Sequence, residues 1–313
     1  MNGKHVSKNW LDQRAYQTMI ENGFEPEFSP AVREQVAQIQ ARAGGQTNAS
    51  VRNMQDLAWS SIDNATSRDL DQIEWAEDLP NGDIRVLVGI ADVDESVDKD
   101  SPIDRHAAEN TVTIYTDTEI FPMLPQELST DLTSLAEGAD RPAVVAEMVV
   151  KENGDVPEST FYRALVRNRA KLDYDSVGDW LDGHGEIPAK LASTPGLEEQ
   201  IEIQQKAAIR LQKYRTAKGA LQFESIESSA IIENGEVRGL KSVEPNSARK
   251  LIENFMVAAN VEMAEFLENH NAPALRRIGA GRFDSGRRVA GRFIEAGGRQ
   301  PFSNQPAGGL HQQ

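Results

Sequence analysis

The sequence contains no cysteine, and this absence excludes several classes of protein. Disulfide scaffolds, thiolate zinc sites and cysteine nucleophiles all depend on that side chain. Histidine is scarce as well, and the residues of this type stand far apart, at positions 5, 106, 184, 270 and 311. A metal site built from histidine is therefore not expected.

Long apolar segments are also missing. No apolar run approaches the roughly 18 residues that a membrane-spanning helix requires. The first ten residues, MNGKHVSKNW, lack the apolar core of a signal peptide. We therefore expect a cytoplasmic protein with no membrane association. Its 313 residues suggest about two domains, at roughly 150 residues per domain.

Positive charge is in short supply, because 33 Lys and Arg residues face 49 Asp and Glu residues, for a formal net charge of −16. Such a balance argues against a non-specific affinity for nucleic acid, which depends on Lys and Arg. The charge is distributed unevenly, however. Fourteen acidic and only three basic residues lie between Asp56 and Asp104, whereas the chain from Ala274 onwards has seven arginines and two acids.

The hydrophobic pattern predicts an α+β protein with strands in the middle of the chain. Residues 1–50 are expected to form two helices followed by the linker AGGQTNAS. The run IRVLVGIADV at 84–93 predicts a buried strand, and further strands are expected at 110–116, 144–150 and 159–166. A turn at 152–155 and a hairpin at 230–240 follow. Helical spacing predicts helices at 197–219 and 247–270.

The end of the chain has a different composition. Eight residues after Ala274 are glycine, all basic residues there are arginine, and no hydrophobic periodicity continues past Ile278. One interpretation is a disordered, RNA-binding tail at 278–313. The other, which we favour, is that a shifted reading frame or a truncated gene produced this segment, because it carries no packable pattern.

A cluster of carboxylates is the strongest chemical signal. The stretch SSIDNATSRDLDQIEW at 60–75 places Asp63, Asp69 and Asp71 within nine residues. If 69–75 is extended, Asp69 and Asp71 point to the same side, and the turn-like NATSR can bring Asp63 beside them. Oxygen ligands without His or Cys suit Mg²⁺, or Mn²⁺. A solvated acidic loop is the alternative, and the pattern of a calcium loop is absent.

This stretch resembles the signature of the RNase II/RNase R (RNB) family of 3′→5′ exoribonucleases. The resemblance continues in order through GIADV (89–93), FPMLPQELSTDLTSL (121–135), AKLDYDSVGDWLDG (170–183), KGALQF (218–223) and LIENFMVAAN (251–260). It covers roughly 52–277 and implies a catalytic domain at 51–277 with a mixed sheet and flanking helices. It also implies an RNA channel that ends at the carboxylates.

The resemblance assigns roles to individual residues. Asp63, Asp69 and Asp71 would hold Mg²⁺, with Asp71 the most critical of the three. Gln72 belongs to the implied metal site and stands where the family usually has a fourth aspartate; its neutral amide oxygen can accept from a metal-bound water but supplies no charge. This departure puts the affinity for a second cation in doubt.

Three further residues are implied in substrate binding. Tyr115 would lie against the last RNA base, Phe223 would clamp the terminal nucleotides, and Glu253 would contact the nucleotide near the 3′ end. Stacking tolerates any base, which suits a non-specific exonuclease. Without the resemblance, the two aromatic residues would be read as core residues and Glu253 as a surface acid of a helix.

The implied activity is hydrolysis of single-stranded RNA to nucleoside 5′-monophosphates, assisted by Mg²⁺ and without an organic cofactor. The alternative is a catalytically inactive, RNA-binding remnant of the same family. Two family features are missing. The helical N-terminal segment cannot contain the five-stranded OB domains that usually precede the catalytic domain. The Ser-Pro-Ile-Arg-Arg-type motif is absent too, because SGRR around Arg287 lacks the preceding Pro-Ile. We therefore expect an incomplete catalytic domain with little activity.

Overall fold

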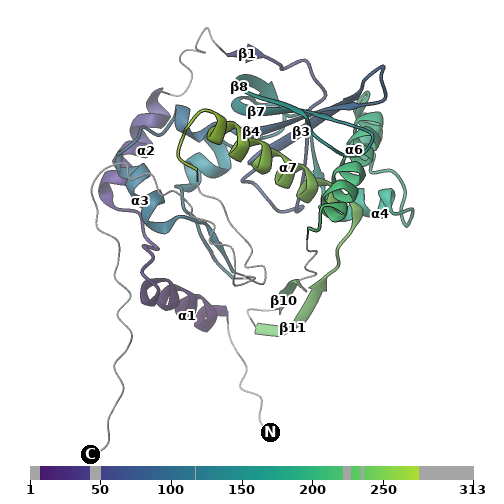
Figure 1. The fold of residues 1–313 in the computed structure, drawn as a ribbon. Coiled ribbons are helices and arrows are strands. Elements are labelled where there is room, and N and C mark those ends of the chain that lie inside the picture. Colours follow the sequence, from purple (N-terminus) through teal and green to yellow (C-terminus); the bar gives the residue numbers. More distant parts are fainter. Residues whose placement is uncertain (1–7, 43–50, 117, 221–226, 234–235, 275–313) are drawn as a thin grey trace, which may run out of the picture. The chain divides into compact units, whose positions relative to one another are not determined.

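The computed structural model describes residues 8–42, 51–116, 118–220, 227–233 and 236–274, and the structural statements below concern these residues (Figure 1). The tail predicted from residue 278 onwards lies outside them, as does Phe223. Within the described ranges, no helix is both long enough and apolar enough to span a lipid bilayer.

Seven strands form the central sheet (Figure 1). They are β1 (Arg52–Asn53), β2 (Ser60–Asp63), β3 (Gln72–Asp78), β4 (Ile84–Ala91), β7 (Asp140–Val150), β8 (Glu158–Arg167) and β9 (Ala170–Asp173). Their order is β1-β8-β7-β4-β3-β2-β9. The inner pairs are antiparallel, whereas β1 is parallel to β8 and β2 is parallel to β9. The sheet is therefore mixed.

Helices cover one face of this sheet. They are α4 (Tyr174–Leu181), α5 (Ala189–Ser193), α6 (Leu197–Ala217) and α7 (Ser247–Asn269). Val86 and Met148 of the sheet are fully buried there in one core with Ile201 of α6 and Phe255 of α7. Each such burial contributes roughly 1.5–3 kcal/mol, so the helices and the sheet stabilise one another.

The opposite face of the sheet has a core of its own. It includes Trp59, Ile73, Leu87 and Val145, all of which have less than 2% of their surface exposed. Alternation along β3 explains the division, because Ile73 and Trp75 enter this core while Ala76 enters the helix-covered one. Both faces of the central strands are thus buried.

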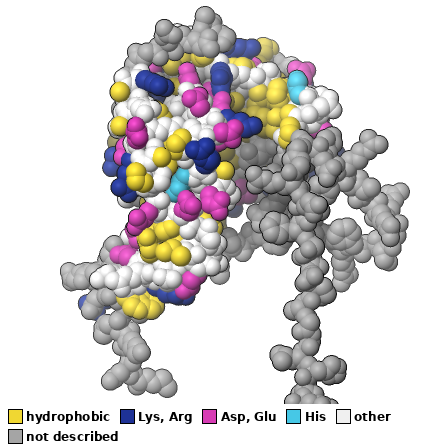
Figure 2. Space-filling model, turned by 90° about the vertical axis from the view of Figure 1, so that its left-hand side faces the viewer, with side chains coloured by type: hydrophobic (Ala, Val, Ile, Leu, Met, Phe, Trp, Pro, Cys, Tyr) yellow, Lys and Arg dark blue, Asp and Glu magenta, His cyan; other side chains and the backbone are white. Residues whose placement is uncertain are grey.

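The second of the two N-terminal helices belongs to a third core. Helices α1 (Lys8–Glu21) and α2 (Pro30–Arg42) precede the sheet, and Val32 and Val36 of α2 pack with Ile103 of α3 (Pro102–Asn110). The Ser101 hydroxyl caps α3 by accepting from the backbone N–H of Asp104. On the side of the molecule seen in Figure 2, the described acidic and basic side chains are interspersed and form no broad basic surface.

Several short elements complete the described structure. They are the 3₁₀ turn η1 (Val93–Glu95), the hairpin β5 (Ile114–Tyr115) and β6 (Ile120–Phe121), the π-helical turn η2 (Leu128–Leu132) and the hairpin β10 (Glu227–Glu233) and β11 (Glu236–Val243).

The predicted α+β class is confirmed, and the predicted strands at 84–93, 144–150 and 159–166 correspond to β4, β7 and β8. Two expectations were wrong in extent. β3 begins only at Gln72, so Asp69 and Asp71 belong to the connection before it. The strand expected at 110–116 is reduced to Ile114–Tyr115, because α3 runs through Asn110 and Thr111 ends it in the left-handed region, with φ 61°.

Candidate active site

Three aspartates lie together at the connection between β2 and β3. Asp63 is the last residue of β2, and Asp69 and Asp71 belong to residues 64–71, which we call the carboxylate loop. β2 and β3 are neighbouring antiparallel strands, so the loop returns the chain beside its starting point. The charges of Asp63 and Asp69 both act on the carboxyl group of Asp71. The three predicted residues thus share one strand connection.

The beginning of the carboxylate loop is a turn built around Asp63. The Asp63 Oδ1 atom accepts from the backbone N–H of Asn64 at 2.6 Å and from the Ser67 hydroxyl at 2.8 Å. The backbone N–H of Ser67 donates to the carbonyl of Asn64 at 3.0 Å. The turn predicted for NATSR therefore forms, and it orients one carboxylate oxygen.

The middle of the loop is fixed by Ser134, a buried residue. Its hydroxyl accepts from the backbone N–H of Leu70 at 3.1 Å and donates to the carbonyl of Arg68 at 2.9 Å. These two peptide groups flank Asp69. The backbone N–H of Leu135 also donates to the Leu70 carbonyl at 2.8 Å, so the main chain on both sides of Asp69 is held.

Tyr115 reaches the cluster from the β5–β6 hairpin. Its side chain is 62% exposed, so the interpretation as a core aromatic residue is wrong. The hydroxyl donates to Asp69 Oδ2. Partial burial and this bond to Asp69 raise the pKa of Tyr115, so the phenol keeps its proton at neutral pH and remains a donor. An exposed aromatic ring therefore stands directly beside the carboxylates.

Asp71 experiences the repulsion within the cluster. Desolvation raises the pKa of its carboxyl group, its own backbone N–H lowers it, and the charges of Asp63 and Asp69 raise it further. The Asp71 side chain remains exposed to solvent, so water screens part of this repulsion. The Asp71 carbonyl is held by the backbone N–H of Ala91 at 2.9 Å. Like charges held together in this way favour a bound cation.

Gln72 and Glu74 on β3 are buried polar residues next to the cluster. Glu74 is fully buried, and neither of its carboxylate oxygens has a hydrogen-bond partner among the described residues. Desolvation raises the pKa of Glu74 well above its ordinary value, with further contributions from Asp71 and Asp63. The sequence analysis missed Glu74. The available signal was strand alternation, which places Glu74 on the same side of β3 as the buried Ala76.

Tyr174 is a second residue that the sequence analysis missed. It begins α4, and Arg249 lies 4.6 Å above its ring. Desolvation raises the pKa of Tyr174, and the negative charges of Asp63 and Glu74 raise it further. The signal was its position in the block that begins with β9, directly beside β2 in the sheet.

Of the other two predicted substrate-binding residues, only Glu253 is among the described residues, and its predicted contact with the RNA stays a prediction. Glu253 lies exposed on α7, while its neighbours Ile252 and Asn254 are buried. Phe223 falls outside the described residues, so its predicted role stays a prediction.

The chemistry of the cluster fits a hard divalent cation, because all of its donors are oxygen atoms and three of them are carboxylates. In the described part of the chain, however, no group of three or more His, Asp or Glu side chains is arranged closely enough to hold an ion as it stands. The oxygens of Asp63 and Asp69 are bonded to Ser67 and Tyr115 instead. A cation would have to compete with these two hydroxyl donors.

Comparison with known proteins identifies the family. The model of the RNB domain matches residues 51–285, which is most of the chain. The chain belongs to the RNB family. Ribonuclease R of Escherichia coli (strain K12) is 33% identical over 250 residues, which cover 79% of this chain and 30% of that protein. The chain therefore spans less than a third of this curated relative.

Solved structures agree with the RNB fold. Mycoplasma genitalium RNase R, in a complex with ribose-methylated single-stranded RNA, matches with a TM-score of 0.74 and 25% identity, covering 82% of this chain and 40% of that one. The predicted RNB-type fold is thereby confirmed. Yeast Ssd1, a pseudonuclease, matches with a TM-score of 0.53 and 14% identity over 70% of this chain and 26% of that one, and this match shows the fold alone.

Proposed function

We propose that this chain provides the hydrolytic site of a 3′→5′ exoribonuclease, which degrades single-stranded RNA to nucleoside 5′-monophosphates. The observation that carries the proposal is that Asp63, Asp69 and Asp71 all lie at the one connection between β2 and β3 in an RNB-family chain. RNA as the substrate is supported by the similarity to an RNase R that was solved with RNA.

The three aspartates would hold Mg²⁺ or Mn²⁺ through their carboxylate oxygens. A bound cation of this kind would supply an activated water and neutralise charge on the scissile phosphate. Ser67 holds one carboxylate oxygen of Asp63, and Ser134 holds the main chain on both sides of Asp69. The exposed ring of Tyr115 offers a stacking surface for a terminal base, and such stacking needs no particular base.

An inactive RNA-binding protein is the second candidate. Gln72, which replaces an expected carboxylate, is buried and neutral, and the three aspartates do not converge on one point as they stand. Both observations would reduce the affinity for cations. A chain of this kind would keep the RNA-binding surface and lose the hydrolysis.

Release of nucleotides from a labelled oligoribonucleotide tests the proposal. The purified 313-residue protein is incubated with Mg²⁺, and the products are identified by chromatography. We expect nucleoside 5′-monophosphates in low yield from the parent, as for an incomplete catalytic domain, and none from Asp71→Asn. This variant should bind RNA equally or more tightly because one charge that repels phosphate is gone. The matched control is Asp78→Asn, since Asp78 is an exposed acid at the end of β3, the strand that follows Asp71, and pairs with Lys206.

The outcomes separate the two candidates. RNA binding without release in the parent supports the inactive alternative. Release by Asp71→Asn within a few-fold of the parent would contradict the assignment of Asp71, and a parent that does not bind RNA at all would contradict both candidates.

A further inference from the structure

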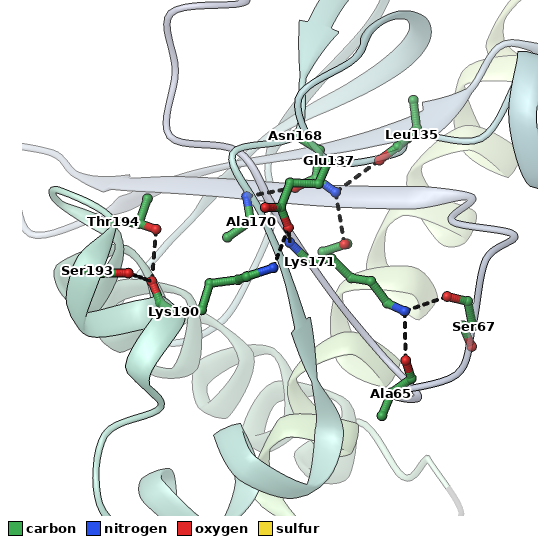
Figure 3. A network of polar contacts seen from close by, with 11 residues as sticks. Ala65, Ser67, Leu135, Glu137, Asn168, Ala170, Lys171, Lys190, Ser193 and Thr194 are labelled. Atoms are coloured by element: carbon green, nitrogen blue, oxygen red, sulfur yellow. Dashed lines mark hydrogen bonds and ion pairs between the residues drawn. The ribbon is translucent and has the colours of Figure 1, made fainter.

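Lys171 on the edge strand β9 contacts the carboxylate loop (Figure 3). Its ammonium group donates to the carbonyl oxygen of Ala65 at 2.9 Å and also to the carbonyl oxygen of Ser67. Both carbonyls lie between Asp63 and Asp69. One side chain from more than 100 residues away therefore binds two peptide groups of the turn that orients Asp63.

The main chain of Lys171 is itself held in place. β9 pairs in parallel with β2, and Lys171 lies opposite Ser61 in this register. The backbone N–H of Lys171 donates to Glu137 Oε2 at 2.8 Å, and Lys190 of α5 donates to the same oxygen at 2.6 Å (Figure 3). The lysine thus projects from a fixed position beside the strand that ends in Asp63.

The bonding of Lys171 differs from that of a lysine that only balances charge. An ammonium group has three donors, and two of them go to backbone carbonyls here. Among the ion pairs of the described residues, Lys171 has none with Asp63, Asp69 or Asp71. Ordering a long side chain costs conformational entropy, and the two bonds to the loop carbonyls offset this cost. Lys171 is therefore a point at which the carboxylate loop is attached to β9.

We propose that Lys171 is a positioning residue that sets the spacing between Asp63 and Asp69 by holding the turn between them. The inference rests on the proposed function, in which Asp63 and Asp69 bind the same cation and must therefore keep a fixed spacing. Lys171 acts through the loop backbone and does not itself contact substrate or cation.

The sign of one measurement separates positioning from a simple charge effect. Removing a positive charge close to three carboxylates would by itself make cation binding tighter. Loss of the two bonds to the loop would instead let Asp63 and Asp69 move apart and would make cation binding weaker. The two explanations predict opposite changes.

The test is titration of the full 313-residue protein with Mn²⁺, monitored by electron paramagnetic resonance of the free ion. We expect Lys171→Met to weaken binding by about tenfold or more, as is typical when a residue that orients metal ligands is lost. Lys171→Arg should retain binding, because it can still donate to both carbonyls. The matched control Lys190→Met shares the Glu137 partner but has no bond to the loop, and it should change binding by about twofold at most. Equal or tighter binding by Lys171→Met would overturn the proposal.

Hydrogen exchange supplies a readout that does not depend on the metal. In Lys171→Met, amides of residues 64–70 should exchange faster than in the parent, while those of β4 stay unchanged. Acceleration throughout the chain would show a general loss of stability, and unchanged exchange in the loop would show that Lys171 does not hold it. Either result overturns the proposal. If the parent binds no Mn²⁺ in a way that depends on Asp71, the cation in the proposed function is wrong, and loop exchange alone decides about Lys171.

Discussion

Glu74 shows how strongly one residue can be affected by its surroundings. A carboxyl group without hydrogen-bond partners is costly to bury in its charged form, so the folded protein favours the protonated form. Because folding raises the pKa of Glu74, the folded chain binds the proton more tightly than the unfolded chain. The contribution of this proton to the free energy of unfolding is fully present below the unfolded pKa of Glu74, near 4.5. It is lost as the pH rises through the folded pKa.

Glu74→Gln should therefore flatten the dependence of stability on pH. Between the unfolded and the folded pKa of Glu74, the parent should lose about 1.4 kcal/mol per pH unit relative to the variant. Urea denaturation at several pH values, from about pH 5 to about pH 8, measures this difference. Glu77→Gln, a change of the same type in the same strand at a partly exposed acid paired with Arg85, should keep the slope of the parent. Parallel curves for Glu74→Gln and the parent would show that Glu74 titrates alike in both states.

Two substitutions of Tyr115 separate the contribution of its ring from that of its hydroxyl. Because the ring is largely exposed, Tyr115→Ala should leave the melting temperature nearly unchanged but weaken binding of short RNA by about 1–3 kcal/mol, the usual value of one stacked base. Tyr115→Phe should keep the stacking and lose only the bond to Asp69. Fluorescence anisotropy with labelled RNA, beside thermal melting, measures both effects. RNA affinity that is the same for the parent and both variants would exclude stacking on Tyr115.

At the scale of elements, the turn between β7 and β8 is fitted closely to α6. Gly154 has a φ of 86°, and a Cβ atom at this position would lie 2.1 Å from the carbonyl oxygen of Arg210. Gly138 has a similar φ of 78° but no atom within 4 Å of such a Cβ. Substitution of these two glycines therefore distinguishes the cost of a left-handed backbone conformation from the added cost of a clash with α6.

Gly138→Ala should cost about 1–2 kcal/mol of unfolding free energy, which is the penalty for a left-handed residue that carries a side chain. Gly154→Ala should cost more, by a further 1–3 kcal/mol or so, because α6 has to move away from the turn. Midpoints of urea unfolding for the two variants give the comparison. Equal losses would mean that the turn and α6 separate at little cost.

The sequence predicted those elements that local pattern decides. Apart from Arg85, β4 is an apolar run with buried residues on both faces, and the turn at Gly154 has a distinctive composition. α3 was different, because Asn110 looks like the start of a strand. Its side chain instead bonds the backbone N–H of Glu25 at 2.8 Å and the Glu25 carbonyl at 2.9 Å, which ties the helix end to a residue 85 positions earlier. Local pattern contains no trace of such a contact.

The candidate site also has features that local sequence predicts and features that depend on distant residues. The proximity of Asp63, Asp69 and Asp71 follows from nine residues of sequence and a turn. The burial of Glu74 depends on α6, where Gln204 reaches the Glu74 carbonyl at 3.4 Å, and the support from Lys171 depends on β9. Both partners are more than 100 residues distant, so neither could be read from the motif itself.

At the scale of the whole molecule, β2 pairs with one strand that is close in the sequence and with one that is distant. Its antiparallel partner β3 follows almost at once, whereas its parallel partner β9 begins at Ala170. Pairing over such a separation is slow, because a long loop has to close before the contact is gained. The antiparallel series β3-β4-β7-β8 has shorter connections. In refolding followed by pulsed hydrogen exchange, we expect β4 amides to become protected before those of β2, and simultaneous protection would contradict this order.

The late arrival of β9 also has a consequence during synthesis. Translation proceeds at about 5–20 residues per second, so the aspartates leave the ribosome several seconds before Asp173 does. During that interval the nascent chain has every carboxylate of the site and lacks the strand that carries Lys171. A growing chain that sits among messenger and ribosomal RNA would therefore acquire the proposed hydrolytic site only after the remainder of its sheet is complete.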